Sequence, residues 1–458
     1  MASSGMSTGY DLLDTAVRSA RHYLSDLNVR SVAPSAAAIE ALSALKEPLP
    51  ERSIDPAETL ALLDRLVSPA TMGMAGPRFF GFVIGGSLPV ALAANWLAGA
   101  WDQNAGLNEI TPGVARVEEI ALQWLLELFE LPATTAAGFV TGATVANFTA
   151  LAAARHAVLA RAGWNVEADG LFGAPPISVI IGEEAHPTLL KSLGMLGLGR
   201  SRVVRVPVDR QGRMRPEALP RLKAPAILCV QAGNVNTGAF DPFGPLIERA
   251  HADGAWVHVD GAFGLWAKAA PTLRHLAAGL ERADSWATDA HKWLNVPYDS
   301  GLAFSRDGHA LRAAMAITAE YLPTQSRHRN PCDFTPELSR RARGVEVWAA
   351  LRSLGKAGLA ELFERNCRQA ARFAQRLRTA GHTILNEVVL NQVLVSFGDA
   401  ERTRAVIAAL QQEGTCWCGP TVWQGHTAMR ISVSSWATTD DDVERSVDAM
   451  LRVAAATS

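Results

Sequence analysis

The sequence predicts an α/β fold in which helices cover both faces of a mostly parallel sheet. Short apolar runs alternate with helical stretches, as expected for parallel strands that are buried on both faces. Polar residues stand at the ends of several runs, where open α/β sheets bind their ligands. A chain of 458 residues also has the length for two or three domains. The apolar runs lie at residues 177–181, 202–207, 226–230, 255–259 and 284–288.

Three domains are expected from the changes in pattern along the chain. Residues 1–75 form an arm of helices interrupted by prolines, which is too small and broken to fold alone. Residues 76–336 contain the alternating pattern and form the large domain. Residues 337–458 form a smaller α+β domain, which begins with a helix over residues 337–354 and contains a strand over residues 429–436.

The composition argues against a protein that binds nucleic acid, spans a membrane or binds a metal. The net charge is −2, and no run of basic residues is present to attract nucleic acid or an anionic membrane. Apolar stretches such as residues 89–100 are too short to cross a bilayer, and the N-terminus lacks the pattern of a signal peptide. The five cysteines lack the spacing of metal ligands, and reduced thiols are typical of the cytoplasm. We therefore expect a cytoplasmic protein without a metal.

Lys292 and Asp260 are the first candidates for catalytic residues. Lysine is uncommon here, with six lysines among 43 basic residues, and only its amine can lose a proton and attack a carbonyl. Asp260 follows the apolar run at residues 255–259 and is expected at a strand end. A surface lysine and a helix-capping aspartate are the ordinary alternatives. Together the two residues favour pyridoxal phosphate (PLP), because the lysine can form an imine with it and the aspartate can keep its pyridine nitrogen protonated.

A phosphate-binding turn is expected before the alanine-rich helix that follows residues 139–142. Gly142, Ala143 and Thr144 stand at the start of this helix. Small residues there leave backbone N–H groups free for a phosphate, and the helix dipole favours an anion. An ordinary helix capped by Thr141 or Thr144 is the alternative. The lysine and aspartate elsewhere in the chain favour phosphate binding.

Two motifs resemble the group II PLP-dependent decarboxylases, which include the aromatic-amino-acid and glutamate decarboxylases. The motifs are His258-Val-Asp260-x-Ala262 and Asp289-Ala-His291-Lys292-Trp293. The resemblance extends from about Pro77 to the C-terminus. It implies the PLP-dependent transferase-like fold (fold type I) and a carbon–carbon lyase that removes the carboxyl group of an L-amino acid. It also implies a homodimer with active sites at the interface and the N-terminal arm packed across the partner.

The resemblance assigns cofactor-binding roles to matching residues. His186 and Ala262 would sandwich the pyridine ring of PLP. The turn around Asn234 could reach the cofactor through its amides, although the family often has Gly-Thr-Thr at this point. The phosphate would be held by Ala143, Thr144 and His291.

The substrate pocket is also assigned by resemblance. Phe82 and Trp101 would line it near the dimer interface, and Arg430 would lie near the substrate carboxylate, where its fork can donate two hydrogen bonds. Core packing of the aromatic residues and a surface ion pair of Arg430 are the alternatives. The aromatic residues favour an aromatic or bulky apolar substrate, and the lack of a clear cluster of basic residues argues against glutamate.

The proton donor is where this sequence departs from the family pattern. In the aromatic-amino-acid decarboxylases the donor is a tyrosine in a mobile loop, and the best match here is Phe334. Tyr321, which opens this loop, Tyr298 and His328 are the possible substitutes.

Three functions are therefore carried forward. The first is decarboxylation of an L-amino acid to its amine and CO₂. The second is a decarboxylating aldehyde synthase or another PLP-dependent carbon–carbon lyase, because relatives with phenylalanine at this loop position use O₂ and form an aldehyde, ammonia and peroxide. The third and weakest is a PLP-binding protein without catalytic activity.

Overall fold

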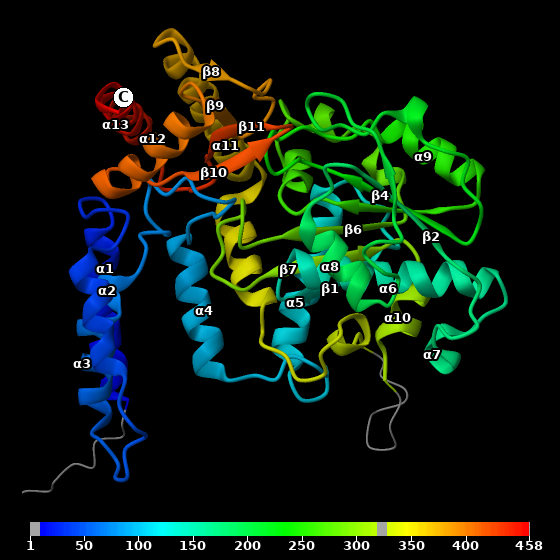
Figure 1. Cartoon of the computed structure of the whole chain (residues 1–458). Coiled ribbons are helices and arrows are strands. Elements are labelled where there is room, and N and C mark those ends of the chain that lie inside the picture. The colour runs from blue at the N-terminus through cyan, green and yellow to red at the C-terminus, as the bar shows by residue number, and fades with distance from the viewer. Residues whose placement is uncertain (1–9, 318–327, 458) are drawn as a thin grey trace, which may run out of the picture.

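A helical arm, a large α/β body and a smaller lobe make up the chain (Figure 1). The computed structural model describes residues 10–317 and 328–457. Within these residues no helix is long and apolar enough to span a membrane.

The arm extends along one side of the molecule, away from the large sheet (Figure 1). None of its α-helices contains a fully buried residue, and Leu13, Ile39 and Leu63 are exposed. A hydrogen bond of 2.7 Å from Ser19 Oγ to Asp64 Oδ2 links two of them. The arm comprises α1 (Asp11–Asp26), α2 (Ala36–Ala41), α3 (Pro56–Leu66) and the 3₁₀ turns η1 (Leu42–Leu45) and η2 (Ser68–Ala70).

The body is built on a seven-stranded sheet in the order β1-β7-β6-β5-β4-β2-β3. Strands β2 to β6 run parallel to one another, and β7 is antiparallel to both of its neighbours, β1 and β6. The predicted apolar runs coincide with β2 to β6, so the expected α/β fold with a mostly parallel sheet is confirmed. The strands are β1 (Ala136–Val140), β2 (Ser178–Gly182), β3 (Val204–Val206), β4 (Ala226–Gln231), β5 (Trp256–Asp260), β6 (Ser285–Asp289) and β7 (Gly301–Ser305).

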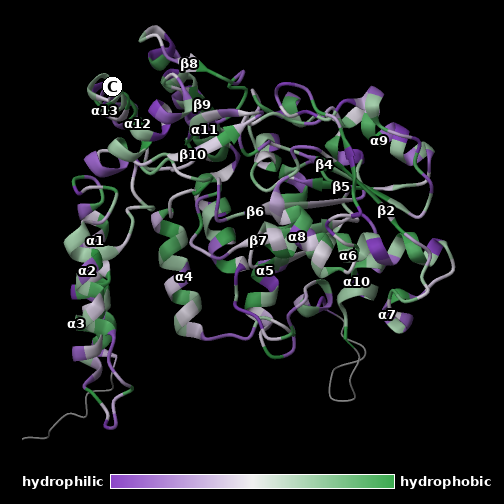
Figure 2. Cartoon of the chain, in the orientation of Figure 1, coloured by the Kyte–Doolittle hydropathy of each residue, from purple (hydrophilic) through white to green (hydrophobic). Residues whose placement is uncertain are grey.

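Alternate residues of the central strands belong to two different hydrophobic cores. Leu228 and Val230 of β4 pack with α5 and α9, whereas Ile227 and Cys229 pack with α6, α8 and α10. Because both faces of the sheet are buried in this way, the sequences of these strands are continuously apolar (Figure 2). The helices of the body are α4 (Pro89–Trp101), α5 (Pro112–Leu128), α6 (Ala143–Arg161), α7 (Val166–Asp169), α8 (Pro187–Met195), α9 (Phe243–Ala252) and α10 (Gly308–Met315). Its 3₁₀ turns are η3 (Pro216–Ala218), η4 (Gly264–Ala269), η5 (Arg274–Ala277), η6 (Leu280–Arg282) and η7 (Pro331–Phe334).

Small side chains bring α6 close to the sheet. Ala146 and Ala150 are fully buried and pack against Val140, Ala287 and Ala303 of the strands below them. The N-terminus of α6 is therefore held close to the ends of β1 and β6, where the candidate site lies.

The smaller lobe contains an antiparallel sheet in the order β10-β11-β9-β8. Helix α11 (Gly344–Thr379) has a kink at Gly355, which has a φ of +58°. Before the kink α11 packs on α4 and α5, and after it on β9 and α13. The other elements are β8 (Thr383–Ile384), β9 (Gln392–Ser396), α12 (Ala400–Glu413), β10 (Gly419–Trp423), β11 (His426–Ser432) and α13 (Asp440–Ala456).

Two predicted elements have different limits in the structure. The helix expected from Glu337 begins at Gly344, and the strand expected to reach Trp436 ends at Ser432. The first difference has a clear cause, because Arg340 points inward and its side chain is fully buried. Its guanidinium donates to Glu118 Oε2 (2.9 Å) and to two backbone carbonyls, so this segment follows these contacts rather than a helix.

Candidate active site

Three neighbouring strands carry polar residues to the same edge of the sheet. Gln231, Asp260 and Asp289 are the last residues of β4, β5 and β6. Gln231 and Asp260 are directly paired across these strands. This edge is where a parallel α/β sheet is expected to bind a ligand.

Asp260 is a buried carboxylate that makes one hydrogen bond in the described structure. Its side chain accepts from the backbone N–H of Ala262 (3.3 Å), and 4% of the residue is exposed. Burial raises the pKa of Asp260, and the neighbouring His186 and Lys292 oppose this rise. Because a buried carboxylate is stable only with a donor or a cation, Asp260 is suited to bind the protonated ring nitrogen of a cofactor.

Lys292 approaches the site from the turn after β6. Its Nζ lies 2.9 Å from Asp289 Oδ2. The other oxygen of Asp289 accepts a hydrogen bond from Ala143 N (2.5 Å), at the first turn of α6. Asp289 therefore links the reactive lysine to the phosphate-binding turn that the sequence predicts.

His291 lies between Asp289 and Tyr298. Its Nδ1 accepts from Ser300 N (3.0 Å), and its Nε2 is 3.4 Å from Asp289 Oδ1. Its ring stacks on Tyr298 with the centroids 4.3 Å apart. Since Nδ1 is an acceptor, the proton of the neutral ring is on Nε2, where a phosphate could accept it.

The turn before α6 is closely packed against His291 and the start of β7. A Cβ atom on Gly142 would lie 3.0 Å from His291 Cε1, and one on Gly301 would lie 2.5 Å from Gly142 Cα. The first backbone N–H groups of α6 are thus next to His291. A helix start of this kind binds phosphate well, so Thr144 and His291 fit the predicted role, whereas the N–H of Ala143 already donates to Asp289 Oδ1.

His186 forms the N-cap of α8 and lines the same cavity as Asp260. Its Nδ1 accepts from Thr188 N (3.3 Å). Burial is the main cause that lowers the pKa of His186, and the positive charges of Lys292 and Arg430 act in the same direction. A neutral, flat imidazole at this place fits the predicted packing against a pyridine ring.

The geometry agrees with comparisons to known proteins. A family model for the pyridoxal-dependent decarboxylase conserved domain matches residues 44–398. The chain belongs to this family. It is 28% identical to tryptophan decarboxylase 1 of Oryza sativa subsp. japonica, over 82% of this chain and 80% of the relative. It is 26% identical to phenylacetaldehyde synthase of Arabidopsis thaliana, over 86% of each chain.

A solved structure shows the same fold. The crystal structure of Oryza sativa TDC with PLP and tryptamine superposes with a TM-score of 0.92 and 23% identity, and it covers 100% of this chain and 99% of that chain. The decarboxylase family and fold type I expected from the sequence are therefore confirmed. PLP is the cofactor, and the protein is a PLP-dependent carboxy-lyase. In the described part of the chain, no group of three or more His, Cys, Asp or Glu side chains is arranged to hold a metal ion.

The predicted substrate residues occupy different surroundings in this decarboxylase. The loop that carries Phe82 passes close to Lys292, because a Cβ on Gly85 would lie 1.8 Å from the carbonyl oxygen of Lys292. Phe82 is exposed and stacks on Trp417 at 6.0 Å. Trp101 is exposed at the C-terminus of α4.

Phe334 is the last residue of η7, which packs against α10 and β1. It packs with residues of α6 and α10, and Arg329 lies 4.4 Å above its ring. The hypothesis that Phe334 takes the place of a catalytic tyrosine remains a prediction, because the resemblance places this loop over the site of the neighbouring subunit. Of the other predicted donors, His328 is exposed beside Arg329, and Tyr321 lies outside the described residues.

Asn234 is buried, and its side chain is engaged in its own turn. Oδ1 accepts from the backbone N–H groups of Asn236 and Thr237, and Nδ2 donates to Gln231 Oε1 (3.1 Å). Any contact between this turn and PLP would therefore come from the backbone rather than from the side chain of Asn234.

The sequence analysis gave no role to Asp289, although this residue contacts Lys292 and Ala143. Its spacing, three residues before the lysine at the end of β6, was the signal available in the sequence. We expect Asp289→Asn to increase the rate of PLP uptake by the cofactor-free protein by about tenfold, because the ion pair at Nζ must break before Lys292 reacts. Uptake is measured by stopped-flow absorbance, with Asp284→Asn at the opposite end of β6 as control. Slower uptake in Asp289→Asn would contradict this role.

His258, in the motif His258-Val-Asp260-x-Ala262, contacts a neighbouring strand and helix α6 and has a structural role. It is fully buried between Ser285 Oγ (2.9 Å) and Asn147 Oδ1 (2.8 Å), and burial lowers its pKa to about 3. In the unfolded chain its pKa is near 6.5, so below this pH the unfolded state binds the additional proton. The contribution of neutral His258 to the free energy of unfolding is therefore complete above pH 6.5 and is lost as the pH falls toward 3.

This difference in pKa predicts how stability depends on pH. Between pH 7.5 and pH 5, the wild type should lose about 2 kcal/mol more free energy of unfolding than His258→Gln. Urea unfolding of both proteins at the two pH values measures this difference, in which the contributions of other groups cancel. Equal losses would show that His258 is not responsible.

Proposed function

We propose that the protein decarboxylates an L-amino acid with an aromatic or bulky apolar side chain to the amine and CO₂. The observation that carries this proposal is the convergence of Lys292, Asp260 and His186 at one edge of the sheet. PLP supplies an electron sink for the bond that breaks. Lys292 holds the cofactor through Nζ, and the carboxylate of Asp260 stabilises the positive charge of its ring nitrogen.

The remaining residues of the site bind the cofactor and the substrate and orient them. Thr144 and His291 hold the phosphate, and His186 and Ala262 pack on the two faces of the ring. Arg430 binds the carboxyl group that is to leave. By fixing the cofactor from three sides, these residues hold the reacting bond in one orientation, which contributes much of the rate.

The buried cations in the described part of the chain are already paired with carboxylates, and this supports an apolar substrate rather than an acidic one. A substrate with a distal carboxylate would need a second free cation in the site. Among the described residues, the other buried cations each have a carboxylate partner: Arg78–Asp442, Lys268–Glu130 and Glu281, Arg340–Glu118 and Arg343–Asp299. Arg430 has no carboxylate partner among the described residues, so it is available to bind the α-carboxylate of the substrate.

Oxidative formation of an aldehyde is the second candidate, and its support is the similarity to phenylacetaldehyde synthase. Incubation of the PLP-loaded protein in air with the standard amino acids and Dopa tests both candidates. Mass spectrometry detects amine or aldehyde, and a peroxidase assay detects peroxide. Amine without peroxide supports the first candidate. Aldehyde with one equivalent each of ammonia and peroxide, formed from O₂ and water, supports the second.

We also propose a homodimer with the arm packed on a second copy. The arm helices bury no residue completely, and Trp96 and Leu97 are exposed on the neighbouring α4. Size-exclusion chromatography with light scattering should give twice the mass of one chain; a monomer would refute the dimer. A cytoplasmic location is supported by the five cysteines, all of which are free thiols.

A further inference from the structure

Arg430 is a partly buried cation whose hydrogen-bond partner is a neutral side chain. Its guanidinium donates to Asn236 Oδ1 at 3.2 Å, and burial lowers its pKa to about 10. No described carboxylate forms an ion pair with it, in contrast to the other buried arginines. A buried charge without a counter-ion is unfavourable, so the structure favours the arrival of an anion at this place.

The turn after β4 presents Asn236 to Arg430. Asn234 Oδ1 accepts from Asn236 N (2.9 Å) and from Thr237 N (3.2 Å), which fixes the conformation of the turn. Asn236 Oδ1 also accepts from Thr421 Oγ1 (2.9 Å) on β10, the strand that pairs with β11. The amide of Asn236 therefore lies between the turn and the strand that carries Arg430.

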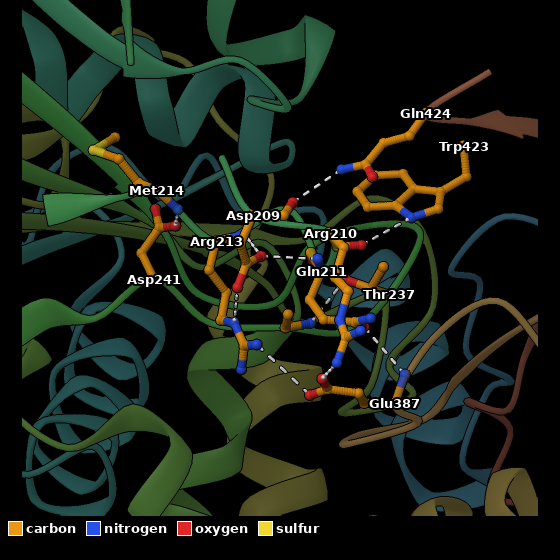
Figure 3. A network of polar contacts seen from close by, with 11 residues as sticks. Asp209, Arg210, Gln211, Arg213, Met214, Thr237, Asp241, Glu387, Trp423 and Gln424 are labelled. Atoms are coloured by element: carbon orange, nitrogen blue, oxygen red, sulfur yellow. Dashed lines mark hydrogen bonds and ion pairs between the residues drawn. The ribbon is translucent and has the colours of Figure 1, made fainter. Parts of the chain in front are cut away.

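A hairpin at residues 208–214 holds this turn against the smaller lobe (Figure 3). Gln211 O accepts from Thr237 Oγ1 (2.7 Å), and Gln211 Oε1 accepts from Glu387 N (3.1 Å). The tip of the β10–β11 hairpin donates to the same segment, through Gln424 to Asp209 O (2.9 Å) and Trp423 to Arg210 O (3.3 Å). Turn, hairpin and β11 thus form one connected unit.

We propose that Asn236 is a positioning residue, which holds Arg430 so that its remaining N–H groups bind the α-carboxylate of the substrate. Asn236 occupies one N–H group of the guanidinium without neutralising its charge, whereas an aspartate there would supply a competing internal carboxylate. Arginine can donate two parallel hydrogen bonds to a carboxylate, and this requires a fixed orientation. The inference rests on the proposed function, because it concerns the binding of the group that is removed.

The test compares ligands with and without a carboxylate on the PLP-loaded protein. Dissociation constants are measured by absorbance titration for an amino acid that the enzyme converts and for the amine that it yields, together with KM and kcat. We expect Asn236→Leu to weaken binding of the amino acid about tenfold, since it loses one oriented charged contact, and to leave binding of the amine unchanged. Val422→Ala, at an exposed position on the same strand as Thr421, serves as the control and should bind both ligands like the wild type.

Asn236→Asp retains the size and the acceptor, so it keeps the test valid even if Asn236→Leu fails to fold. Its carboxylate should pair with Arg430 and weaken binding of the amino acid at least as strongly as the leucine variant does, again without effect on the amine. Equal weakening of both ligands would indicate a structural role and overturn the inference, as would unchanged binding of the amino acid by Asn236→Asp. A wild type that releases CO₂ from no amino acid would instead refute the proposed function itself.

Discussion

Lys292→Ala should abolish both covalent attachment of PLP and decarboxylation, with a fall in kcat of roughly 10³-fold or more. The physical reason is that no other described lysine reaches the strand ends at which Asp260 and His186 converge. Borohydride reduction followed by peptide mass spectrometry should find the cofactor on residue 292 in the wild type and on no residue in the variant.

Two further variants separate the amine chemistry of Lys292 from its charge. Lys292→Arg retains a cation that can pair with Asp289 but cannot form the covalent link, so it should be as inactive as Lys292→Ala. Lys356→Ala removes an exposed lysine that pairs with Glu127 and should keep full activity. Covalent PLP in Lys292→Ala would exclude Lys292 as the attachment site.

Asp260→Asn should lower kcat by roughly 10²- to 10³-fold, the usual effect of losing one preorganised electrostatic contact. The amide is isosteric and can still accept from Ala262 N, so the fold and covalent attachment of PLP should persist. An amide carries no charge and therefore stabilises a protonated ring nitrogen much less than the carboxylate does. Activity assays on PLP-loaded protein measure the loss.

Two carboxylate variants control for this change. Asp284→Asn lies at the opposite end of the adjoining strand and should keep nearly full activity. Asp260→Glu retains the charge, so its activity should exceed that of Asp260→Asn. If Asp260→Asn retained wild-type kcat, the proposed role of the carboxylate would be wrong.

The fold could be predicted, and candidate residues for the site could be selected, because their signals are local. Parallel strands buried on both faces give apolar runs, and these located β2 to β6 to within a few residues. Lys292 and Asp260 were found because each side chain follows such a run and has a chemical property that its neighbours lack.

Contacts between distant segments could not be predicted in this way. Arg340 breaks the expected helix because Glu118, more than two hundred residues earlier, lies buried beside it. The pairing of Asn236 with Arg430 joins segments 194 positions apart. Phe334 was assigned to the site by its place in the chain, and its packing beside α10 could not be read from the sequence. In each case the decisive partner is a neighbour only after folding.

The small size of the alanine side chains between α6 and the sheet determines the distance between the predicted phosphate-binding turn and the sheet. Ala150 is fully buried at this contact, about two turns from the end that holds Ala143. A bulkier residue there would lift the helix, because packed cores do not absorb added volume. We therefore expect a larger residue at position 150 to weaken the binding of PLP, although this position lies about two turns away from the predicted phosphate-binding turn.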